Sequence, residues 1–469
     1  MQENFQLTNA RSAKFSDAEF DMLAQSTWSV DCCSIELKQR CEGGRCYSGV
    51  GHLSQDQEGQ VRYKIYVTKS ENTEDNKLRN PGVPGTLIPE TDYYDLTMAD
   101  VHHRIWKGER ILPGVFQHMN GMDILSGRLD EITCEGEIPQ KVSAPGSNLS
   151  CYVFEKIDIP INAKSSLHRH IAGLHRQRQF KLNCWKFRAA KSQFLLFNDE
   201  NERLNIHVSS DAHSLPDHLS TRVLEALFFV LGRPIHPTVI TQRSLHQTRC
   251  TLYSRRLIAR NARHQPPLAI RLLTDSKTNR ITVEPYNKLF RQYLKYGLNF
   301  EGHHPPLWAQ LNAVYEASAG AFIDAYALTL CVAIESILNS EFGNVAKPTQ
   351  KQIDTVDAAL KHLKDWQGDN AIKQRIKGSV SSLKSSRAGD KLNLFKDQGI
   401  ISAKAVKAWT ILRNKNAHEY QNNSLQEDKF RECLQQVNAL FYQLIFHAIK
   451  YRGPYNDHGT AGWPVRQFP

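Results

Sequence analysis

Three side chains in the stretch "AWTILRNKNAHEYQ" (408–421) could act together on a phosphate ester. Arg413 carries a planar cation whose N–H groups match two phosphate oxygens, and Asn414 can both donate and accept hydrogen bonds. His418 has a side chain that titrates near neutral pH, so it can serve as a general base or acid. Asn414 and His418 are four residues apart and share one face of a helix. These residue types predict proton transfer beside a bound phosphate.

The spacing Arg-x4-His carries little information by itself. The chain has 19 histidines, and about one such pair is expected by chance in a sequence of this kind. The surroundings are more informative, because Val406, Trp409 and Leu412 recur at helical spacing. They predict a buried stripe on a helix over 402–420, with Ser402 as its N-cap. The alternative interpretation is that Arg413 and His418 merely solvate the exposed face of this helix.

The elements that position this stretch are predicted to be helices. From about residue 305 onward, helical periodicity appears at 320–343, 349–366, 371–384, 402–420 and 424–452. The segment 320–343 is apolar over a broad face and is expected to be the central helix of a bundle. That face is formed by Phe322, Tyr326, Leu330, Ala333, Ile334, Ile337 and Leu338. A bundle of four to five helices is therefore predicted for residues 305–452.

The first half of the chain has a different pattern. Residues 1–210 show short alternating or apolar runs, and 192–199 with 202–210 predict a hairpin around "NDEN". We expect a β-rich domain there, either a sandwich or a barrel-like sheet. Helices at 215–237 and 286–298 make 211–304 a connector, and the Gly- and Pro-rich tail 453–469 is expected along the surface. The predicted class is α+β, with a β-rich N-terminal domain followed by an all-α bundle.

Composition and charge narrow the class of partner. The chain has 469 residues, a formal net charge of +11 and a pI of about 9.1. This balance favours polyanions such as RNA, although many basic proteins bind none. The polar N-terminus does not resemble a secretory signal, and we find no apolar run of the length that a bilayer requires. The sequence predicts a cytoplasmic protein without a membrane segment.

The ten cysteines are too few for a disulfide scaffold of this size, so reduced thiols are expected. Cys32, Cys33, Cys41 and Cys46 lie close together and are the only group that suggests zinc. Their spacing lacks the paired C-x2-C form. In addition, adjacent residues of a strand point to opposite faces, so Cys32 and Cys33 cannot easily both ligate one ion. We therefore expect neither a metal nor another cofactor.

Two basic segments could grip a nucleic acid. The first, 168–191, mixes cations with Phe180, Trp185 and Phe187, and the second is 253–264. Cations track a phosphate backbone while aromatic rings stack on bases. The alternative is a solvated basic face. The predicted RNA-binding residues are Arg176, Arg178, Lys186, Arg188, Arg255, Arg256 and Arg260.

The stretch "LRNKNAHEY" and its place in the chain resemble the HEPN (higher eukaryote and prokaryote nucleotide-binding) family. That family is a helical bundle with Arg-polar-x3-His on a late helix, followed by one long final helix. The matching positions are Arg413, Asn414 and His418. The upstream segment "ALTLCVAIESILNS" is similar to the family's core helix, with an acidic residue at Glu335. The overall layout also resembles the ApeA-type defence proteins of bacteria.

The resemblance implies a metal-independent endoribonuclease whose active cleft is completed by a homodimer or a higher oligomer. Arg413, Asn414 and His418 would be catalytic, Glu335 auxiliary, and RNA, including transfer RNA, the substrate class. The N-terminal region would sense a phage-derived trigger or a nucleotide ligand. Two alternatives remain: a non-catalytic HEPN scaffold that dimerises or binds nucleotide, and a toxin silenced by attachment of AMP to Tyr420. Tyr420 could equally be a packing residue near the helix end.

Overall fold

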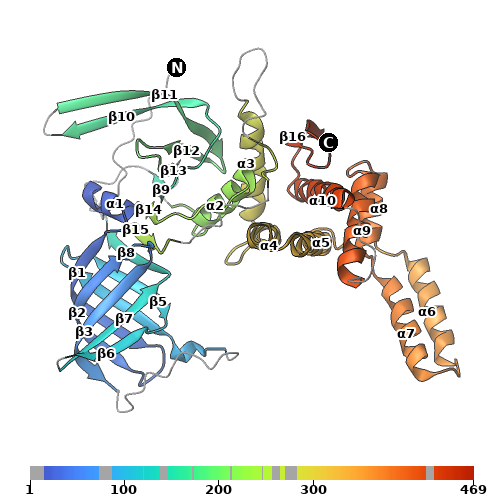
Figure 1. Ribbon diagram of the computed structural model, residues 1–469, viewed down its shortest axis with the longest axis horizontal. Helices are drawn as coiled ribbons and strands as arrows, with labels where there is room; N and C mark the ends of the chain where they lie inside the picture. The colour runs from blue at the N-terminus through green and yellow to red at the C-terminus, as the bar shows by residue number, and fades with distance from the viewer. Residues whose placement is uncertain are drawn as a thin grey trace. The chain divides into compact units, whose positions relative to one another are not determined.

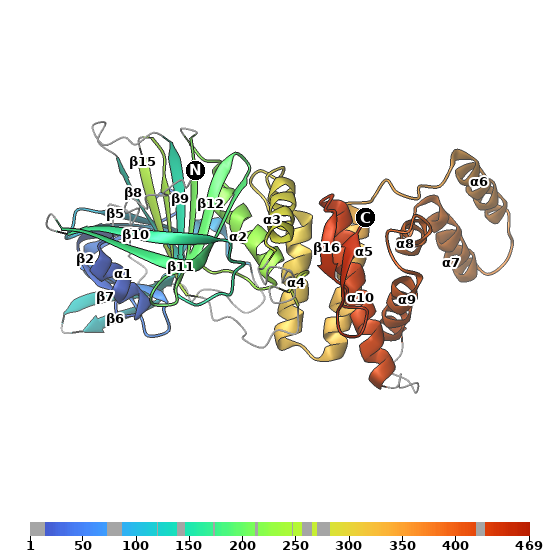
Figure 2. The ribbon, with the colours of Figure 1, turned by 90° about the horizontal axis from the view of Figure 1, so that it is seen from above.

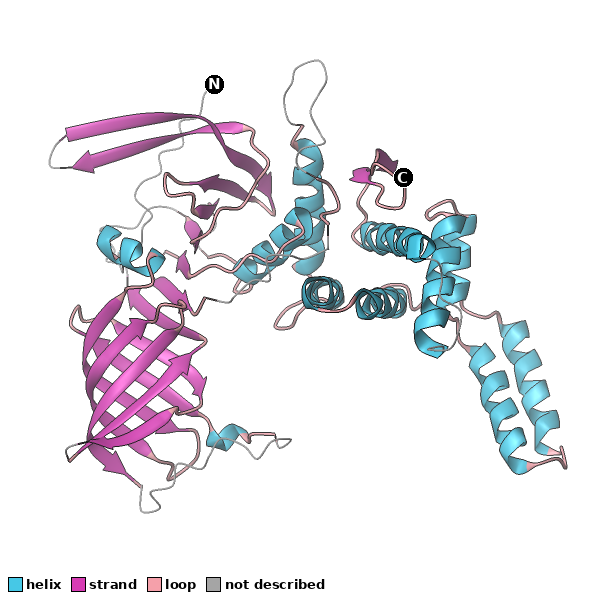
Figure 3. Cartoon of the chain, viewed as in Figure 1, coloured by secondary structure: helices cyan, strands magenta, loops and turns pink. Residues whose placement is uncertain are grey.

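The computed structural model divides the chain into two compact units, each described here by itself. The first comprises Met1–Leu224 and Pro234–Ile258, and the second comprises Glu225–Arg233 and Ala259–Pro469. Strands fill the first unit and helices dominate the second (Figure 3). The described residues are 15–72, 87–119, 121–137, 146–171, 174–211, 214–245, 247–255, 265–269, 282–418 and 427–469, with side chains undescribed at 137, 164–171, 174–182 and 415–418.

The first unit is built on one antiparallel sheet of fifteen described strands. Their order is β10-β11-β12-β13-β9-β14-β15-β8-β5-β4-β1-β2-β3-β7-β6. Strands β1 to β8 curve around a shared interior (Figure 1). The bounds are β1 Ser29–Gln39, β2 Cys46–Gln55, β3 Val61–Glu71, β4 Tyr94–Asp100, β5 Ile105–Ile111, β6 Val115–Met119, β7 Met122–Leu129, β8 Glu131–Glu137, β9 Ser147–Val153, β10 Ala163–Ile171, β11 Leu174–Ala189, β12 Ser192–Asn198, β13 Leu204–Ser210, β14 Val239–Arg243 and β15 Gln247–Tyr253.

The predicted β-rich N-terminal region is confirmed, including the hairpin of β12 and β13, which pairs Phe194 with Val208. Two further strands, β14 and β15, come from the segment expected to connect the domains and join the same sheet. Short helices accompany the strands, namely α1 (Asp17–Ala24) and the 3-10 turn η1 (Glu90–Asp92). Alternating inward residues bury a core that contains Leu37, Tyr63 and Trp106.

A buried charge cluster closes one end of this core. The Asp100 carboxylate is fully buried and accepts hydrogen bonds from Trp106 Nε1 (2.9 Å) and Arg104 Nε (2.6 Å). Arg104 also pairs with Glu19 of α1 at 2.8 Å. Burial by itself would raise the pKa of Asp100, but the hydrogen bonds from Trp106 and Arg104 outweigh it and lower that pKa below its usual value. The cluster thereby ties α1 to the sheet.

The second unit is a helical bundle with a small terminal hairpin. Helix α5 contacts α4, α8, α9 and α10, as seen from above in Figure 2. Helices α6 and α7 pack on each other, and α2 begins in the first unit and ends in the second. The bounds are α2 Leu219–Leu231, α3 Glu284–Gly297, α4 Pro306–Gly320, α5 Ile323–Ser340, α6 Gln350–Lys364, α7 Asn370–Ser381, the 3-10 turn η4 Ser382–Lys384, α8 Ala388–Asp397, α9 Ala403–His418, α10 Glu427–Ala448, β16 Gly453–Asn456 and β17 Val465–Phe468.

Each of the helices predicted from periodicity has a counterpart here, and the sequence missed α1, α4 and α8. On α5 the predicted buried face is confirmed from Tyr326 to Leu338 but is wrong at Phe322, which is 88% exposed. Phe322 is the extended N-cap residue that precedes the first turn, so it lies outside the helical stripe. Helix α5 is also long and apolar enough to cross a membrane. Core helices of soluble proteins meet the same measures of length and composition, so the expectation of a protein without a membrane segment stays a prediction.

The C-terminal tail, which was expected to lie along the surface, forms the hairpin β16–β17. Tyr455 and Phe468 are buried, and both rings pack against Phe446 of α10 at 5.5 and 5.4 Å between centroids. Two aromatic anchors thus dock the tail on the final helix. The sequence analysis did not predict these two buried aromatic residues, because the Gly- and Pro-rich composition of the tail indicated a surface segment.

The buried cluster yields a pH-dependent prediction. The variant Asp100→Asn should lose about 3 kcal/mol of unfolding free energy at pH 7, because it leaves Arg104 without its buried partner. Since the folded pKa of Asp100 lies below the unfolded value, its stabilisation is complete above the unfolded pKa of about 4 and is lost as pH falls through the folded pKa. The gap between wild type and variant should therefore shrink in acid, as urea titrations at pH 7 and pH 3 would measure.

The exposed Asp31 of β1 supplies the control for this test. Asp31→Asn should change the unfolding free energy little at either pH, because its carboxylate is solvated. An equal loss for Asp100→Asn and Asp31→Asn would contradict the role given to the cluster.

Candidate active site

Helix α9 brings the first two residues of the chemical stretch to the surface of the bundle. Ser402 caps the helix by accepting a hydrogen bond from the Ala405 backbone N–H (3.1 Å), as the sequence predicted. The buried face consists of Ala405, Ala408, Trp409 and Leu412, whereas Val406 is only half-buried. This face packs against α5, α8 and α10. Arg413 and Asn414 follow Leu412 directly and are both exposed.

These two residues line a cavity of about 610 Å³ between α9, α5 and the segment that leads into α8. Its wall includes Trp409 and Thr410 from α9, Glu335 and Asn339 from α5, and Arg387 and Asn393 from around α8. The volume falls in the range of small-ligand sites. The lining combines two arginines, three amides, one aromatic ring and the carboxylates of Glu335 and Asp390, so it suits a polar ligand.

Arg413 is held in place by an ion pair across the two helices. Its Nε atom lies 2.8 Å from Oε1 of Glu335 on α5. The side chains are 44% and 31% exposed, so the pair is partly solvated. Only Nε takes part, which leaves both Nη atoms of Arg413 without a hydrogen-bond partner among the described residues. A phosphate could accept hydrogen bonds from them while Glu335 keeps the guanidinium in position.

The remaining residues of the motif are only partly described. Helix α9 continues to His418, so position 418 lies one turn beyond Asn414 on the same side of the helix. The side chain of His418 and the whole of Tyr420 fall outside the described residues. Three of the predicted site residues can be placed, because Arg413, Asn414 and the auxiliary Glu335 all line one cavity.

The wall supplied by the α8 segment was not anticipated from the sequence. Arg387 N–H donates to Asp390 Oδ2 (2.9 Å) at the start of α8, and an Arg387 Nη donates to Ser382 Oγ (2.7 Å). The Lys391 ammonium is buried and donates to Leu338 O (3.0 Å) and Asn339 Oδ1 (3.2 Å) at the end of α5. Burial lowers the pKa of Lys391. The sequence analysis did not single out Lys391, and only the fold shows which groups it reaches.

Of the predicted RNA-binding residues, those whose side chains the structure describes do not line this cavity. Lys186 and Arg188 lie on β11 of the first unit, and Arg255 follows β15 there. The side chain of Phe180, one of the three aromatic residues expected to stack on bases, lies outside the described residues. Trp185 and Phe187 are not available for stacking, because both are buried and the rings of Phe187 and Phe194 stack at 5.0 Å between centroids. That part of the prediction is wrong. The side chains of Arg176 and Arg178, and all of Arg256 and Arg260, lie outside the described residues.

The cysteine group shows the alternation that the strand predicts. Cys32 is buried and Cys33 is exposed on β1, while Cys41 and Cys46 are half-buried. Within the described part of the chain, no group of three or more histidine, cysteine, aspartate or glutamate side chains could hold a metal ion.

Comparisons with known proteins give no match: no protein-family model, no curated protein and no solved structure is similar to this chain.

The geometry of the ion pair predicts a small effect on folding. Glu335→Gln should cost less than about 1 kcal/mol of unfolding free energy, because partly solvated pairs contribute little. Leu412→Ala on the same helix removes a fully buried side chain and should cost about 2–5 kcal/mol. Urea unfolding of both variants measures this. A loss for Glu335→Gln as large as that for Leu412→Ala would assign Glu335 a structural role instead.

Proposed function

We propose that the helical unit is a HEPN-type ribonuclease that cleaves RNA at the cavity around Arg413, as part of a bacterial defence system in the cytoplasm. The observation that carries the proposal is the Arg413–Glu335 pair. It presents a guanidinium whose two Nη atoms have no partner among the described residues, in a cavity of about 610 Å³ beside Asn414.

The proposed chemistry uses the nucleophile that RNA itself contains. His418 removes the proton from the 2′-hydroxyl, which attacks the adjacent phosphorus while the bond to the 5′-oxygen breaks. A second histidine or water protonates the leaving oxygen, and a 2′,3′-cyclic phosphate remains. Arg413 stabilises the negative charge that gathers on the phosphate in the transition state. Asn414 orients the phosphate or the imidazole.

A second copy of the chain would complete this cleft. The outer side of α5 leaves Leu328 and Val332 exposed, Val332 by 54%. Val332 precedes Glu335 by three residues, so it lies next to the ion pair on the helix surface. An apolar patch bordering the cavity favours a protein partner there. Two-fold pairing through this patch would bring two Arg413 side chains to one site.

In this proposal the first unit regulates the ribonuclease activity of the helical unit. A ribonuclease that harms its own cell must be silent until triggered, and the fifteen-stranded sheet is the large remaining part of the chain. The basic residues Lys186, Arg188 and Arg255 could contribute to RNA or trigger binding on that unit. The rival functions are a scaffold that only dimerises or binds nucleotide, and a toxin regulated by AMP attachment at Tyr420.

Cleavage assays separate these functions. Arg413→Ala and His418→Ala should each reduce RNA cleavage by at least about a hundredfold, since each removes a transition-state interaction worth several kcal/mol. Cleavage by wild type should continue in EDTA and should fail on a substrate with a 2′-deoxy sugar at the scissile position. Electrophoresis of a labelled RNA, with detection of the cyclic phosphate end, gives the readout.

The control is Lys407→Ala, which removes an exposed cation of the same helix that lines neither cavity described here. It should retain wild-type cleavage. Undiminished cleavage by His418→Ala, or no cleavage of any RNA by wild type at concentrations that form the oligomer, would sink the proposal and leave the scaffold.

The dimer can be tested separately. Val332→Glu should convert the dimer to a monomer, because it introduces a charge into the apolar patch on α5. The matched control is Val101→Glu, since Val101 is also 54% exposed but belongs to the sheet unit. Light scattering after gel filtration measures the mass. A Val332→Glu protein that remains dimeric would place the interface elsewhere.

A further inference from the structure

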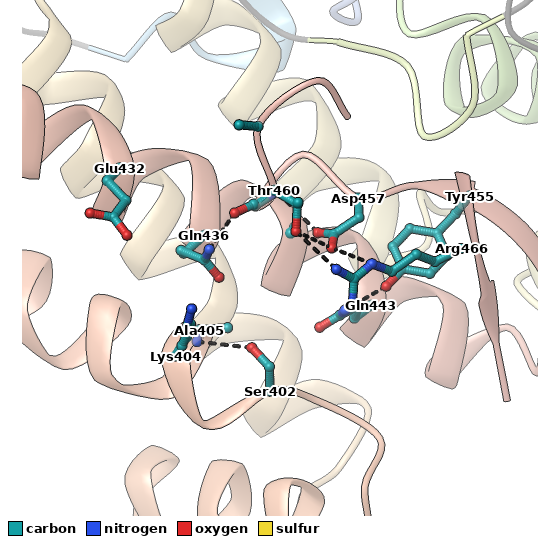
Figure 4. Close-up of a pocket in the computed structure, with 13 residues that line it drawn as sticks. Ser402, Lys404, Ala405, Glu432, Gln436, Gln443, Tyr455, Asp457, Thr460 and Arg466 are labelled. Carbon is teal, nitrogen blue, oxygen red and sulfur yellow. Dashed lines mark hydrogen bonds and ion pairs between the residues drawn. The ribbon is translucent and has the colours of Figure 1, made fainter. Parts of the chain in front are cut away.

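The second cavity of the helical unit lies at the opposite end of α9 from Arg413. It has a volume of about 450 Å³ and is enclosed by the start of α9, the middle of α10 and the C-terminal hairpin with its loop (Figure 4). Side chains from all three elements reach it, among them Ser402, Lys404, Gln436, Gln443, Asp457 and Arg466. None of these residues lines the cavity around Arg413.

One wall is a fixed network within the C-terminal loop. Asp457 accepts hydrogen bonds from the Gly459 backbone N–H (3.1 Å) and from Thr460 Oγ1 (2.7 Å). Its Oδ2 atom also lies 2.9 Å from Nε of Arg466, and the side-chain amide of Gln436 donates to Gly459 O. The loop is thus fastened to α10 and to the last strand. The wall is rigid before any ligand arrives, which reduces the entropy lost on binding.

The floor contains a buried acceptor that the protein does not satisfy. Gln443 is 8% exposed, and its Nε2 atom donates to the Tyr455 hydroxyl at 2.9 Å. Its Oε1 atom has no hydrogen-bond partner among the described residues. In Figure 4 the side chain lies between Tyr455 and Ser402, with the amide oxygen on the side of Ser402. An unpaired buried acceptor costs about 1–3 kcal/mol, so this position calls for a donor from a ligand.

The rest of the cavity lining carries the cation of Lys404 and the carboxylate of Glu432. Lys404 is exposed and forms no ion pair with any described residue. It stands in the first turn of α9, a helix of sixteen residues whose N-terminus carries a partial positive charge. The carboxylate of Asp457, by contrast, is already engaged by Arg466. A ligand therefore meets a cation at Lys404, a carboxylate at Glu432 and a hydrogen-bond acceptor at Gln443.

We infer that this cavity binds a small molecule that carries both an anionic group and an N–H donor. The anion lies at Lys404 and the start of α9, and the N–H donates to Oε1 of Gln443. A nucleoside monophosphate and a free amino acid share this chemistry, with a phosphate or a carboxylate as the anion. The inference goes beyond ribonuclease activity and does not depend on it, because the two cavities have no residue in common.

Calorimetric titration of the full chain tests the site with AMP in one arm and L-glutamine in the other. We expect saturable binding in one arm, which identifies the anion as phosphate or carboxylate. Lys404→Ala and Gln443→Met should each weaken that binding by about tenfold or more, as loss of one charged or buried hydrogen bond implies. Lys407→Ala, three residues along α9, should bind within about twofold of wild type.

Thermal melting of each variant checks that the fold is intact. If Gln443→Met melts at a lower temperature than wild type, Gln443→Glu serves as the second variant. It keeps an acceptor oxygen at this position and should restore much of the binding. The absence of saturable heat in both arms at millimolar probe would overturn the inference. So would binding that both Lys404→Ala and Gln443→Met leave unchanged. Failure here would not affect RNA cleavage, whereas failure of the Arg413 and His418 tests would leave probe binding intact.

Discussion

The packing of α9 onto α5 and α10 is the constraint on which both candidate sites depend. Leu412 and Trp409 are buried, and the Trp409 indole N–H approaches the Cys331 carbonyl of α5 at 3.5 Å. This contact fixes the rotation of α9 about its axis. Arg413, the next residue after Leu412, is thereby turned toward Glu335, at the edge of the buried seam rather than within it. Without this seam the guanidinium would be one more solvated surface cation.

The same helix relates the two cavities to each other. Residues of its first turn border the cavity at Gln443, and residues of its later turns border the cavity at Arg413. A helix of this length transmits displacement along its axis as a nearly rigid element. The supporting elements differ, however. Lys391 secures α8 beside the Arg413 cavity, whereas the aromatic residues Tyr455 and Phe468 secure the terminal hairpin beside the other.

The local sequence pattern predicted the structure correctly where the feature belongs to a single helix or hairpin. The periodicity of Leu330, Ile334 and Leu338 indicated the core helix, and alternation with a turn signal indicated the hairpin of β12 and β13. The prediction from amino-acid composition was wrong for the aromatic residues of the basic segment 168–191. Trp185 and Phe187 stand among cations in the sequence, yet they face the core of the sheet, because neighbouring cations on a strand say nothing about which face is buried.

The sequence by itself determined the two-part architecture, the helix that carries Arg413, Asn414 and His418, and the N-cap at Ser402, because propensity, periodicity and capping act over a few residues. Only the tertiary structure decided that Glu335 reaches Arg413, that the α8 segment walls their cavity, and that Gln443 is buried beneath the C-terminal loop. These contacts join residues between 12 and 78 positions apart. Residues so far apart in the sequence come into contact only when whole helices and hairpins pack together, and a local sequence pattern does not determine that packing.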